Sequence, residues 1–316
     1  MASERILITP RSLTSARHPA LEQLEQAGYQ LVFCTPGRQP DEAELLRLLP
    51  GSVGYLAGVE RVSARVLEAA PGLRAISRNG TGVDNIDLET ASRLGIAVVR
   101  AEGANARGVA ELTIGLMFAL VRHVPFSDRA LKAATWERRQ GIEIAGRVLG
   151  LIGCGRVGQL VARMAASLGM RVVGCDPFRS PVLAQLAGFD YAELDAVLTE
   201  ADVVSLHCPP PVEGRPLIDR ERLAVMRPGA YLINTARGEL LDDQAVLDAL
   251  DSGKLAGVAL DVFRREPPGA DSLVQHERVI AVPHVGGYTE ESVSRAVEMA
   301  VDNLLGALQG RGARNG

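Results

Sequence analysis

Short apolar runs alternate with amphipathic stretches along most of the chain. The runs Arg5–Thr9, Val53–Ala57 and Leu73–Ser77 are mainly apolar, and they predict short strands that are buried in a sheet. The stretch His18–Gly28 repeats apolar residues at helical spacing and ends in a glycine, as helices commonly do. Strands that alternate with helices predict an α/β fold with a parallel, doubly wound sheet.

The second half of the chain continues this alternation with about six predicted strands. These strands are Val148–Ile152, Met170–Cys175, Ala201–His207, Gly229–Thr235, Leu255–Leu260 and Val279–Val282. The apolar segment Asn105–Val121 predicts a buried helix, which we expect Pro125 to end. A chain of 316 residues is long enough for two domains. The last predicted helix, Glu290–Leu308, extends well past the second sheet and could pack back on the first domain, so that the chain would cross between the domains twice.

Three glycines follow the first strand of the second half in the spacing G-x-G-x-x-G. Gly153 allows a tight turn, Gly155 lets the backbone approach a pyrophosphate, and Gly158 lets the next helix pack close to the strand. The N-terminus of that helix offers N–H groups and a partial positive charge to the phosphates. Because strand, loop and helix occur in this order, the segment predicts a dinucleotide site.

Asp176 ends the next predicted strand, 18 residues after Gly158. A carboxylate at this position accepts hydrogen bonds from the adenosine ribose hydroxyls and repels a 2′-phosphate. The sequence therefore predicts NAD rather than NADP as the cofactor. Arg179 qualifies this prediction, because a basic residue just past the acid can accept NADP.

Composition and charge argue against several other classes of protein. The net charge of −4 provides no basic surface of the kind that binds nucleic acid or a membrane. The beginning of the chain lacks the apolar core of a signal peptide, and no apolar run approaches the roughly 20 residues that span a bilayer. Four scattered cysteines without a C-x-x-C pair fit a reducing cytoplasm and indicate neither disulfides nor a metal site.

Three polar residues, Arg237, Glu266 and His284, follow strands of the second half. Parallel strands bring their carboxyl ends to one crevice, where the nicotinamide is expected. Hydride transfer between NAD and a 2-hydroxy acid needs a guanidinium to grip the carboxylate and a histidine to move the hydroxyl proton. It also needs a carboxylate that holds the histidine and favours its charged form. Arg237, His284 and Glu266 suit these roles, although each residue type alone is also common in structural settings.

Two further segments have alternative interpretations. Asn79 and Gly80 follow a predicted strand of the first half and could aim backbone N–H groups at a small anion, or they could form only a turn. The arginine-rich arm between Arg122 and Arg139, which contains Trp136, could hold a second subunit or could be a solvated loop.

Several longer segments share the pattern of one known family. They are Arg78–Asp87, Val109–Thr113, Gly153–Gly158, Leu232–Gly238, Ala259–Phe263 with Glu266–Pro268, and Pro283–Gly287. Because of these segments, the chain resembles the D-isomer-specific 2-hydroxyacid dehydrogenases over essentially its whole length. Within that family, it most resembles the phosphoglycerate dehydrogenase-like branch. The resemblance implies two doubly wound parallel-sheet domains, with a Rossmann cofactor domain (102–284) inserted in a flavodoxin-like substrate domain (1–101 and 285–316). It also implies hinges near Arg100 and His284, and a homodimer built through the cofactor domain.

The resemblance assigns roles to individual residues. The family's catalytic arginine, glutamate and histidine fall on Arg237, Glu266 and His284. The cofactor contacts fall on Thr81, Gly153, Gly155, Arg156, Val157, Gly158, Asp176, Cys208, Thr235, Ala236, Arg237, Asp261, His284, Gly286 and Gly287. The substrate contacts fall on Arg78, Asn79, Gly80, Arg237 and His284. The implied activity is the NAD-dependent interconversion of a small 2-oxo acid and its (R)-2-hydroxy acid, without a metal.

The chain also departs from the family pattern. Several relatives place an arginine after the third strand to hold a substrate phosphate, whereas Ala57–Arg61 carries Glu60, which would repel one. We therefore expect the substrate to be either a phosphorylated acid or a smaller acid such as hydroxypyruvate or glyoxylate. A function of a different class is an NAD(H)-sensing binding protein, because the same fold resembles co-repressors that dimerise on NAD.

Overall fold

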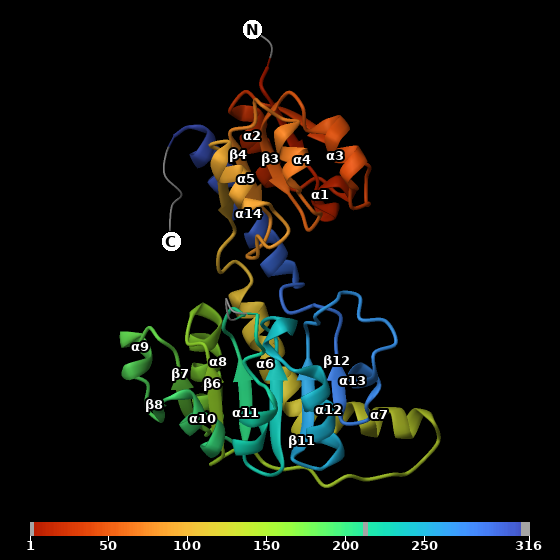
Figure 1. Cartoon of the computed structure of the whole chain (residues 1–316), viewed down its shortest axis with the longest axis vertical. Coiled ribbons are helices and arrows are strands. Elements are labelled where there is room, and N and C mark those ends of the chain that lie inside the picture. Colours follow the sequence, from red (N-terminus) through yellow and green to blue (C-terminus); the bar gives the residue numbers. More distant parts are fainter. Residues whose placement is uncertain (1–2, 211–213, 311–316) are drawn as a thin grey trace. The chain divides into compact units, whose positions relative to one another are not determined.

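The computed structural model describes residues 3–210 and 214–310, and the chain divides into two compact units. The first unit comprises Met1–Asn105 and Glu290–Gly316, and the second comprises Ala106–Thr289. These boundaries lie a few residues beyond the predicted ones at 101 and 284. The chain enters the second unit once and returns to the first unit with its final helix (Figure 1).

A five-stranded parallel sheet forms the centre of the first unit, in the order β2-β1-β3-β4-β5. The strands are β1 (Arg5–Ile8), β2 (Gln30–Phe33), β3 (Ser52–Ala57), β4 (Ala75–Arg78) and β5 (Ala97–Arg100). The helices are α1 (Arg11–Ser15), the 3-10 helix η1 (Pro19–Leu21), α2 (Glu22–Gln26), α3 (Glu42–Leu48), α4 (Ala64–Glu68), α5 (Leu88–Arg93) and α14 (Glu290–Leu308). This strand order is the flavodoxin-like one, so the predicted fold of this part is confirmed.

The final helix α14 completes the core of the first unit. Ile6 and Ile8 of β1 lie in one buried cluster with Val297, Val301 and Leu304 of α14. Leu7, between the two isoleucines, belongs to a different cluster, because successive strand side chains point to opposite faces of a sheet. The expectation that the last helix packs back on the first part of the chain is confirmed.

The second unit contains a seven-stranded parallel sheet in the order β12-β11-β10-β9-β6-β7-β8. The strands are β6 (Val148–Ile152), β7 (Arg171–Cys175), β8 (Phe189–Tyr191), β9 (Val203–Leu206), β10 (Ala230–Asn234), β11 (Leu255–Leu260) and β12 (Val279–Ala281). The helices are α6 (Ala106–Val121), α7 (Val124–Lys132), α8 (Arg156–Ser167), α9 (Pro181–Ala184), α10 (Leu194–Glu200), α11 (Arg220–Val225), η2 (Gly238–Leu240), α12 (Asp243–Asp251) and α13 (Ser272–Gln275). The strand order reverses at β6, as in Rossmann folds.

Two details of the second unit differ from the expectations. The sheet has one strand more than the six predicted. The additional strand is β8, which has only three residues, and only Phe189 among them is buried, so the sequence shows no apolar run there. The helix α6 ends at Val121, before His123 takes a left-handed conformation with φ +53°. Pro125 lies in the first turn of α7, where the missing N–H group costs nothing. Pro125 therefore starts a helix instead of ending one.

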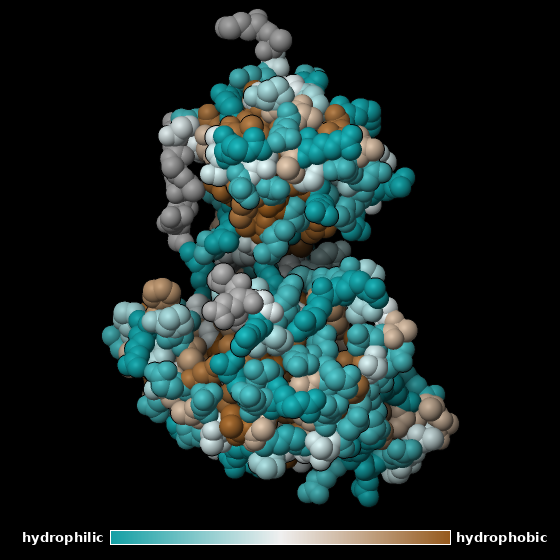
Figure 2. Space-filling model, viewed as in Figure 1, coloured by the Kyte–Doolittle hydropathy of each residue, from teal (hydrophilic) through white to brown (hydrophobic). Residues whose placement is uncertain are grey.

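The surface of the second unit is mixed. On the face seen in Figure 2, hydrophilic residues cover most of this unit, and hydrophobic residues are scattered among them. No single helix of the described residues is long and apolar enough to cross a membrane, whereas the pair α6 and α7, bent by 62°, passes that test by length and composition. Most of the apolar residues of α6 are buried in the core of the unit.

Candidate active site

The three predicted glycines lie in the turn that joins β6 to α8 and in the first turn of α8, which contains Gly158. Gly153 has φ +95°, and a Cβ on it would come within 2.5 Å of the carbonyl group of His207. A Cβ on Gly158 would overlap the carbonyl oxygen of Gly153. At Gly155, the N-cap of α8, a Cβ would meet no described atom within 4 Å. The open space at Gly155 and the first N–H groups of α8 fit a pyrophosphate.

The carboxylate of Asp176 is fixed beside this loop. Its Oδ2 accepts a hydrogen bond from the N–H of Cys154 at 2.6 Å, and its Oδ1 accepts one from the N–H of Phe178 at 2.7 Å. The guanidinium carbon of Arg179 lies 5.6 Å from the centre of the Tyr191 ring, a cation–π contact. Arg179 thus has a partner within the protein. The role of Asp176 in selecting NAD over NADP stays a prediction.

Two thiols near the loop are uncharged at neutral pH. Burial raises the pKa of Cys154 to about 12 and the pKa of Cys208 to about 11, and the charge of Asp176 adds to both increases. A thiolate in the glycine loop would repel a pyrophosphate, so the thiol form of Cys154 suits a dinucleotide site.

Arg237 follows β10 in a turn that Asn234 stabilises. Asn234 is fully buried at the end of the strand. Its Oδ1 accepts a hydrogen bond from the N–H of Ala236 at 3.0 Å, and its Nδ2 donates one to the carbonyl oxygen of Arg237 at 2.8 Å. The side chain of Asn234 therefore fixes the backbone from which the Arg237 guanidinium extends.

His284 follows β12 in a turn that Asp261 stabilises. The carboxylate of Asp261, which is 1% exposed, accepts hydrogen bonds from the N–H groups of Val285 at 2.6 Å and Gly286 at 2.9 Å. His284 itself has φ +52°, a conformation that non-glycine residues rarely adopt. Burial raises the pKa of Asp261, and the two backbone donors oppose this effect. The two turns are joined directly, because the N–H of Asp261 donates to the carbonyl oxygen of Asn234 at 3.0 Å.

Glu266 and His284 form an ion-pair contact in the second unit. The distance from His284 Nδ1 to Glu266 Oε2 is 2.7 Å, and Glu266 Oε1 accepts a hydrogen bond from the N–H of Phe263 at 3.1 Å. Both side chains are also partly exposed, at 54% for His284 and 39% for Glu266. A carboxylate on Nδ1 orients the imidazole and leaves Nε2 for proton exchange with a ligand.

The predicted substrate residues Arg78, Asn79 and Gly80 lie in the first unit, where β4 ends. Gly80 has φ +148°, and a Cβ on it would overlap the guanidinium of Arg78. Arg78 also donates a hydrogen bond to the carbonyl oxygen of Asn79. The buried Oδ1 atom of Asn79 has no hydrogen-bond partner among the described residues, so it is available to a donor.

Glu60 does not extend into solvent as a surface charge. It is 1% exposed, and its Oε1 accepts hydrogen bonds from the hydroxyl of Tyr55 at 2.6 Å, from the N–H of Gly58 at 2.9 Å and from the hydroxyl of Thr9. The carboxylate therefore acts as an internal acceptor that anchors the loop after β3.

The predicted site residues divide between the two units. The first unit contains Thr81, Arg78, Asn79 and Gly80, and the second contains all the others. Within the second unit, Arg237, Glu266 and His284 follow β10, β11 and β12, which are neighbours in the sheet. Of these three residues, Glu266 and His284 are in direct contact. The roles of all the site residues stay predictions.

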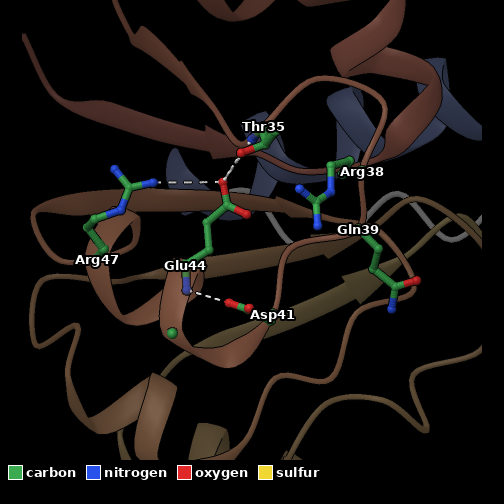
Figure 3. Close-up of a pocket in the computed structure, with 7 residues that line it drawn as sticks. Thr35, Arg38, Gln39, Asp41, Glu44 and Arg47 are labelled. Carbon is green, nitrogen blue, oxygen red and sulfur yellow. Dashed lines mark hydrogen bonds and ion pairs between the residues drawn. The ribbon is translucent and has the colours of Figure 1, made fainter.

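A pocket of about 380 Å³ lies elsewhere, at the end of β2 in the first unit (Figure 3). Its acids already have partners, because Glu44 accepts hydrogen bonds from the N–H and hydroxyl of Thr35 and Asp41 caps α3. Two arginines, Arg38 and Arg47, balance the charge of these two acids. We therefore assign no ligand to this pocket.

The sequence of the second unit matches a known family. Residues 114–286, more than half of the chain, match the family model described as D-isomer specific 2-hydroxyacid dehydrogenase, NAD binding domain. The protein belongs to the D-isomer specific 2-hydroxyacid dehydrogenase family. Residues 114–286 are its NAD-binding domain, and the fit of the glycine loop to a pyrophosphate agrees with this assignment.

Individual relatives of this dehydrogenase family support the assignment. The chain is 40% identical over 258 residues to a D-3-phosphoglycerate dehydrogenase of Methanocaldococcus jannaschii, covering 81% of this chain and 49% of the relative. It spans about half the length of the curated relatives it matches. The TT0316 protein of Thermus thermophilus superposes with a TM-score of 0.88 at 37% identity and covers 98% of this chain and 99% of that one. A D-lactate dehydrogenase of Aquifex aeolicus, solved with NAD and lactic acid, gives a TM-score of 0.81 at 28% identity and covers 97% of this chain and 96% of that one.

The residues that hold the site loops were not predicted from the sequence. Asn234 and Gly238 were not singled out, although they flank Arg237. Asn234 did carry a signal, because an asparagine two residues before the N–H group that it bonds is the spacing of an Asx turn. Gly238 carried no comparable signal, because the backbone that a side chain at this position would overlap, that of Phe263 and Arg264, is distant in the sequence.

Proposed function

We propose that the protein is an NAD-dependent oxidoreductase that interconverts a small 2-oxo acid and its (R)-2-hydroxy acid. The observation that carries this proposal is the 2.7 Å contact between His284 Nδ1 and Glu266 Oε2, next to an NAD-binding domain of this family. Bound NAD supplies or accepts the hydride. The protein then has to hold the acid and move one proton.

In this proposal, His284 is the proton donor and acceptor. Its Nε2 gives a proton to the carbonyl oxygen during reduction of the 2-oxo acid and removes the hydroxyl proton during oxidation. Glu266 keeps the imidazole oriented, because its Oε2 lies 2.7 Å from Nδ1 and can accept the proton of that nitrogen.

Arg237 is proposed to hold the carboxylate of the substrate. A guanidinium can form two parallel hydrogen bonds with a carboxylate, which an ammonium group cannot do. The bonds from Asn234 to the backbone around Arg237 support this role, since they restrict the position of the guanidinium. The expectation that the backbone N–H groups of Asn79 and Gly80 point at an anion is wrong, because they donate to the carbonyl oxygens of Ala57 at 2.9 Å and Arg78 at 2.8 Å. Arg78, Asn79 and Gly80 are still proposed as further substrate contacts, and the Oδ1 of Asn79, which has no partner among the described residues, supports a contact with a ligand that carries a donor.

The substrate is proposed to be either phosphoglycerate-like or a smaller acid such as hydroxypyruvate or glyoxylate. The name of the Methanocaldococcus jannaschii relative favours the first class. The loop Ala57–Arg61 after β3 does not obviously keep the arginine that several relatives use to hold a substrate phosphate, which favours the second.

A homodimer in the cytoplasm is proposed as the working state. Leu131 and Trp136, in and after α7, are 59% and 81% exposed, and aromatic residues of this kind are enriched at protein–protein interfaces. The four cysteines are free thiols, which fits a reducing compartment.

The test is a panel of 2-oxo acids offered with NADH and with NADPH, followed by absorbance at 340 nm. We expect NADH oxidation with at least one small acid, and we expect His284→Ala to reduce turnover by about 10²–10⁴-fold while NADH still binds. Turnover near that of the wild type in His284→Ala would remove this residue from the mechanism. NADH binding without oxidation by any acid would instead favour an NAD-sensing protein.

A further inference from the structure

We propose that Arg264 is a positioning residue that fixes the loop carrying Glu266 against the segment that follows Arg237. This inference rests on the proposed function, because Glu266 matters through its contact with His284. Arg264 acts through that loop and is not proposed to touch the substrate.

The guanidinium of Arg264 forms several contacts with the segment after Arg237. Its Nε donates to the carbonyl oxygen of Leu241 at 3.2 Å, and its Nη2 donates to the same oxygen. Its Nε also lies 3.6 Å from Asp243 Oδ2. Leu241 and Asp243 frame the start of α12, so Arg264 joins its own loop to a rigid element.

The same two segments are in close backbone contact at Gly238. A Cβ on Gly238 would overlap the backbone of Phe263 and Arg264 and would lie 2.6 Å from the carbonyl oxygen of Phe263. The N–H of Phe263 in turn donates to Glu266 Oε1 at 3.1 Å. The backbone that carries Arg264 is therefore the backbone that orients Glu266.

Beside this contact, the loop borders a cavity of about 130 Å³. Leu241 and Asp243 line one part of the cavity, and Phe263, Arg264 and Pro268 line another. A loop next to such a space has few packing contacts that keep it in place. The contacts from Arg264 to Leu241 and Asp243 hold the loop in place, because they connect it across the cavity to the start of α12.

Arg265 offers a matched control. It follows Arg264 in the same loop, is also exposed and lines the same cavity, but no hydrogen bond or ion pair joins it to Leu241 or Asp243 among the described residues. Removing either arginine deletes one positive charge from the loop that carries Glu266. Loss of charge alone would favour the imidazolium and move the pH profile of ketone reduction toward alkaline values. Loss of the position of Glu266 would move the profile toward acid values.

The experiment compares Arg264→Ala, Arg264→Lys and Arg265→Ala in the chain of 316 residues. For each variant, kcat and KM for reduction of the 2-oxo acid are measured across pH, together with the Kd for NADH and the melting temperature. We expect Arg264→Ala to lower kcat by about tenfold and to shift the pH profile toward acid, with unchanged NADH binding. Arg264→Lys should restore most of kcat, because an ammonium still reaches one acceptor, and Arg265→Ala should resemble the wild type in kcat.

Two outcomes would overturn the proposal. One is an Arg264→Ala variant that melts at a lower temperature but keeps the wild-type pH profile, which would indicate a purely structural role. The other is an equal change in Arg265→Ala, which would indicate a general effect of charge.

A second readout separates this proposal from the proposed function. The NMR signal of the His284 imidazole is recorded, and the signal is identified by its loss in His284→Ala. If the wild type reduces no 2-oxo acid, the proposed function fails, but Arg264→Ala should still change the chemical shift of this signal, because the contact between His284 and Glu266 is lost. An unchanged chemical shift would refute the role of Arg264.

Discussion

Among the residues that the structure describes, each unit buries one carboxylate near the carboxyl ends of its strands, and the two carboxylates are used differently. Glu60 in the first unit and Asp261 in the second are both 1% exposed, so both need hydrogen-bond donors to offset the loss of water. The donors to Glu60 are Tyr55, Gly58 and Thr9, which lie in or directly after β1 and β3. The donors to Asp261 are the two N–H groups that follow His284.

This difference teaches that the partners of a buried acid, and not its burial, indicate a link to function. Glu60 closes the loop that contains it, and the bonds therefore stabilise that loop. Asp261 holds a different loop, in which His284 adopts its unusual backbone conformation. The second carboxylate thus determines where the imidazole points.

The largest effects are expected when each acid is neutralised in a variant of its own, Asp261→Asn or Glu60→Gln. We expect each change to lower the free energy of unfolding by about 1–3 kcal/mol, because a buried donor loses its acceptor. Turnover should fall by about 10- to 100-fold in Asp261→Asn, since the turn of His284 is released, and should change little in Glu60→Gln. Chemical denaturation and steady-state kinetics measure the two effects.

NADH binding is measured in the same pair of variants, because Asp261 is also a predicted cofactor contact. Equal losses of turnover in Asp261→Asn and Glu60→Gln would show that the two acids do not differ in the way described.

A smaller effect is expected when the position of His284 is kept and only its partner changes. In Glu266→Gln the amide can still bond to Nδ1, but it no longer carries the charge that favours the imidazolium. We expect the pH profile of ketone reduction to move toward acid. The measurement is kcat/KM across pH with saturating NADH, and a profile that coincides with that of the wild type would exclude Glu266 from the mechanism.

The smallest effect concerns a buried group that carries no charge. Burial lowers the pKa of His207 to about 3, from an ordinary value of 6.5, and its Nε2 lies 2.8 Å from the hydroxyl of Ser205. As the pH falls below 6.5, the unfolded chain binds a proton that the folded protein does not bind. The free energy of unfolding should therefore decrease as the pH falls from 6.5 toward 3 through this residue, and the contribution of His207 is intact above pH 6.5.

The variant His207→Gln tests this contribution, because glutamine can bond to Ser205 without titrating. The difference between wild type and variant in the free energy of unfolding, measured by urea denaturation at several pH values, isolates His207 from the other titrating groups. A difference that stays constant with pH would contradict the lowered pKa.

Much of the fold could be predicted because its signals are local. The helix α14 has the predicted bounds Glu290–Leu308, since its apolar spacing is regular over many turns. The strand β8 was missed because an edge strand of three residues has no recognisable pattern. Pro125 was misinterpreted because proline both ends helices and begins them, and the left-handed His123 that decides between the two has no mark in the sequence.

The candidate site was predictable where a residue follows a strand or lies in a spaced motif. Arg237, Glu266 and His284 could be selected in this way, and the structure brings Glu266 and His284 into contact. Arg264 could not be selected, because its proposed role depends on a hydrogen bond to the carbonyl group of Leu241, which is more than twenty residues away in the chain. Glu60 was interpreted as a charge that repels a phosphate, and only tertiary structure reveals that it is an internal acceptor.

The position of α14 has a consequence for the order in which the protein folds. A ribosome releases β1 first and α14 last, yet Ile6 and Ile8 are covered by residues of α14. The second unit is one continuous segment, so all of its core residues have emerged before α14 does. Because domains generally fold as units during synthesis, the first unit can complete its core only after α14 has been made, and therefore after the second unit.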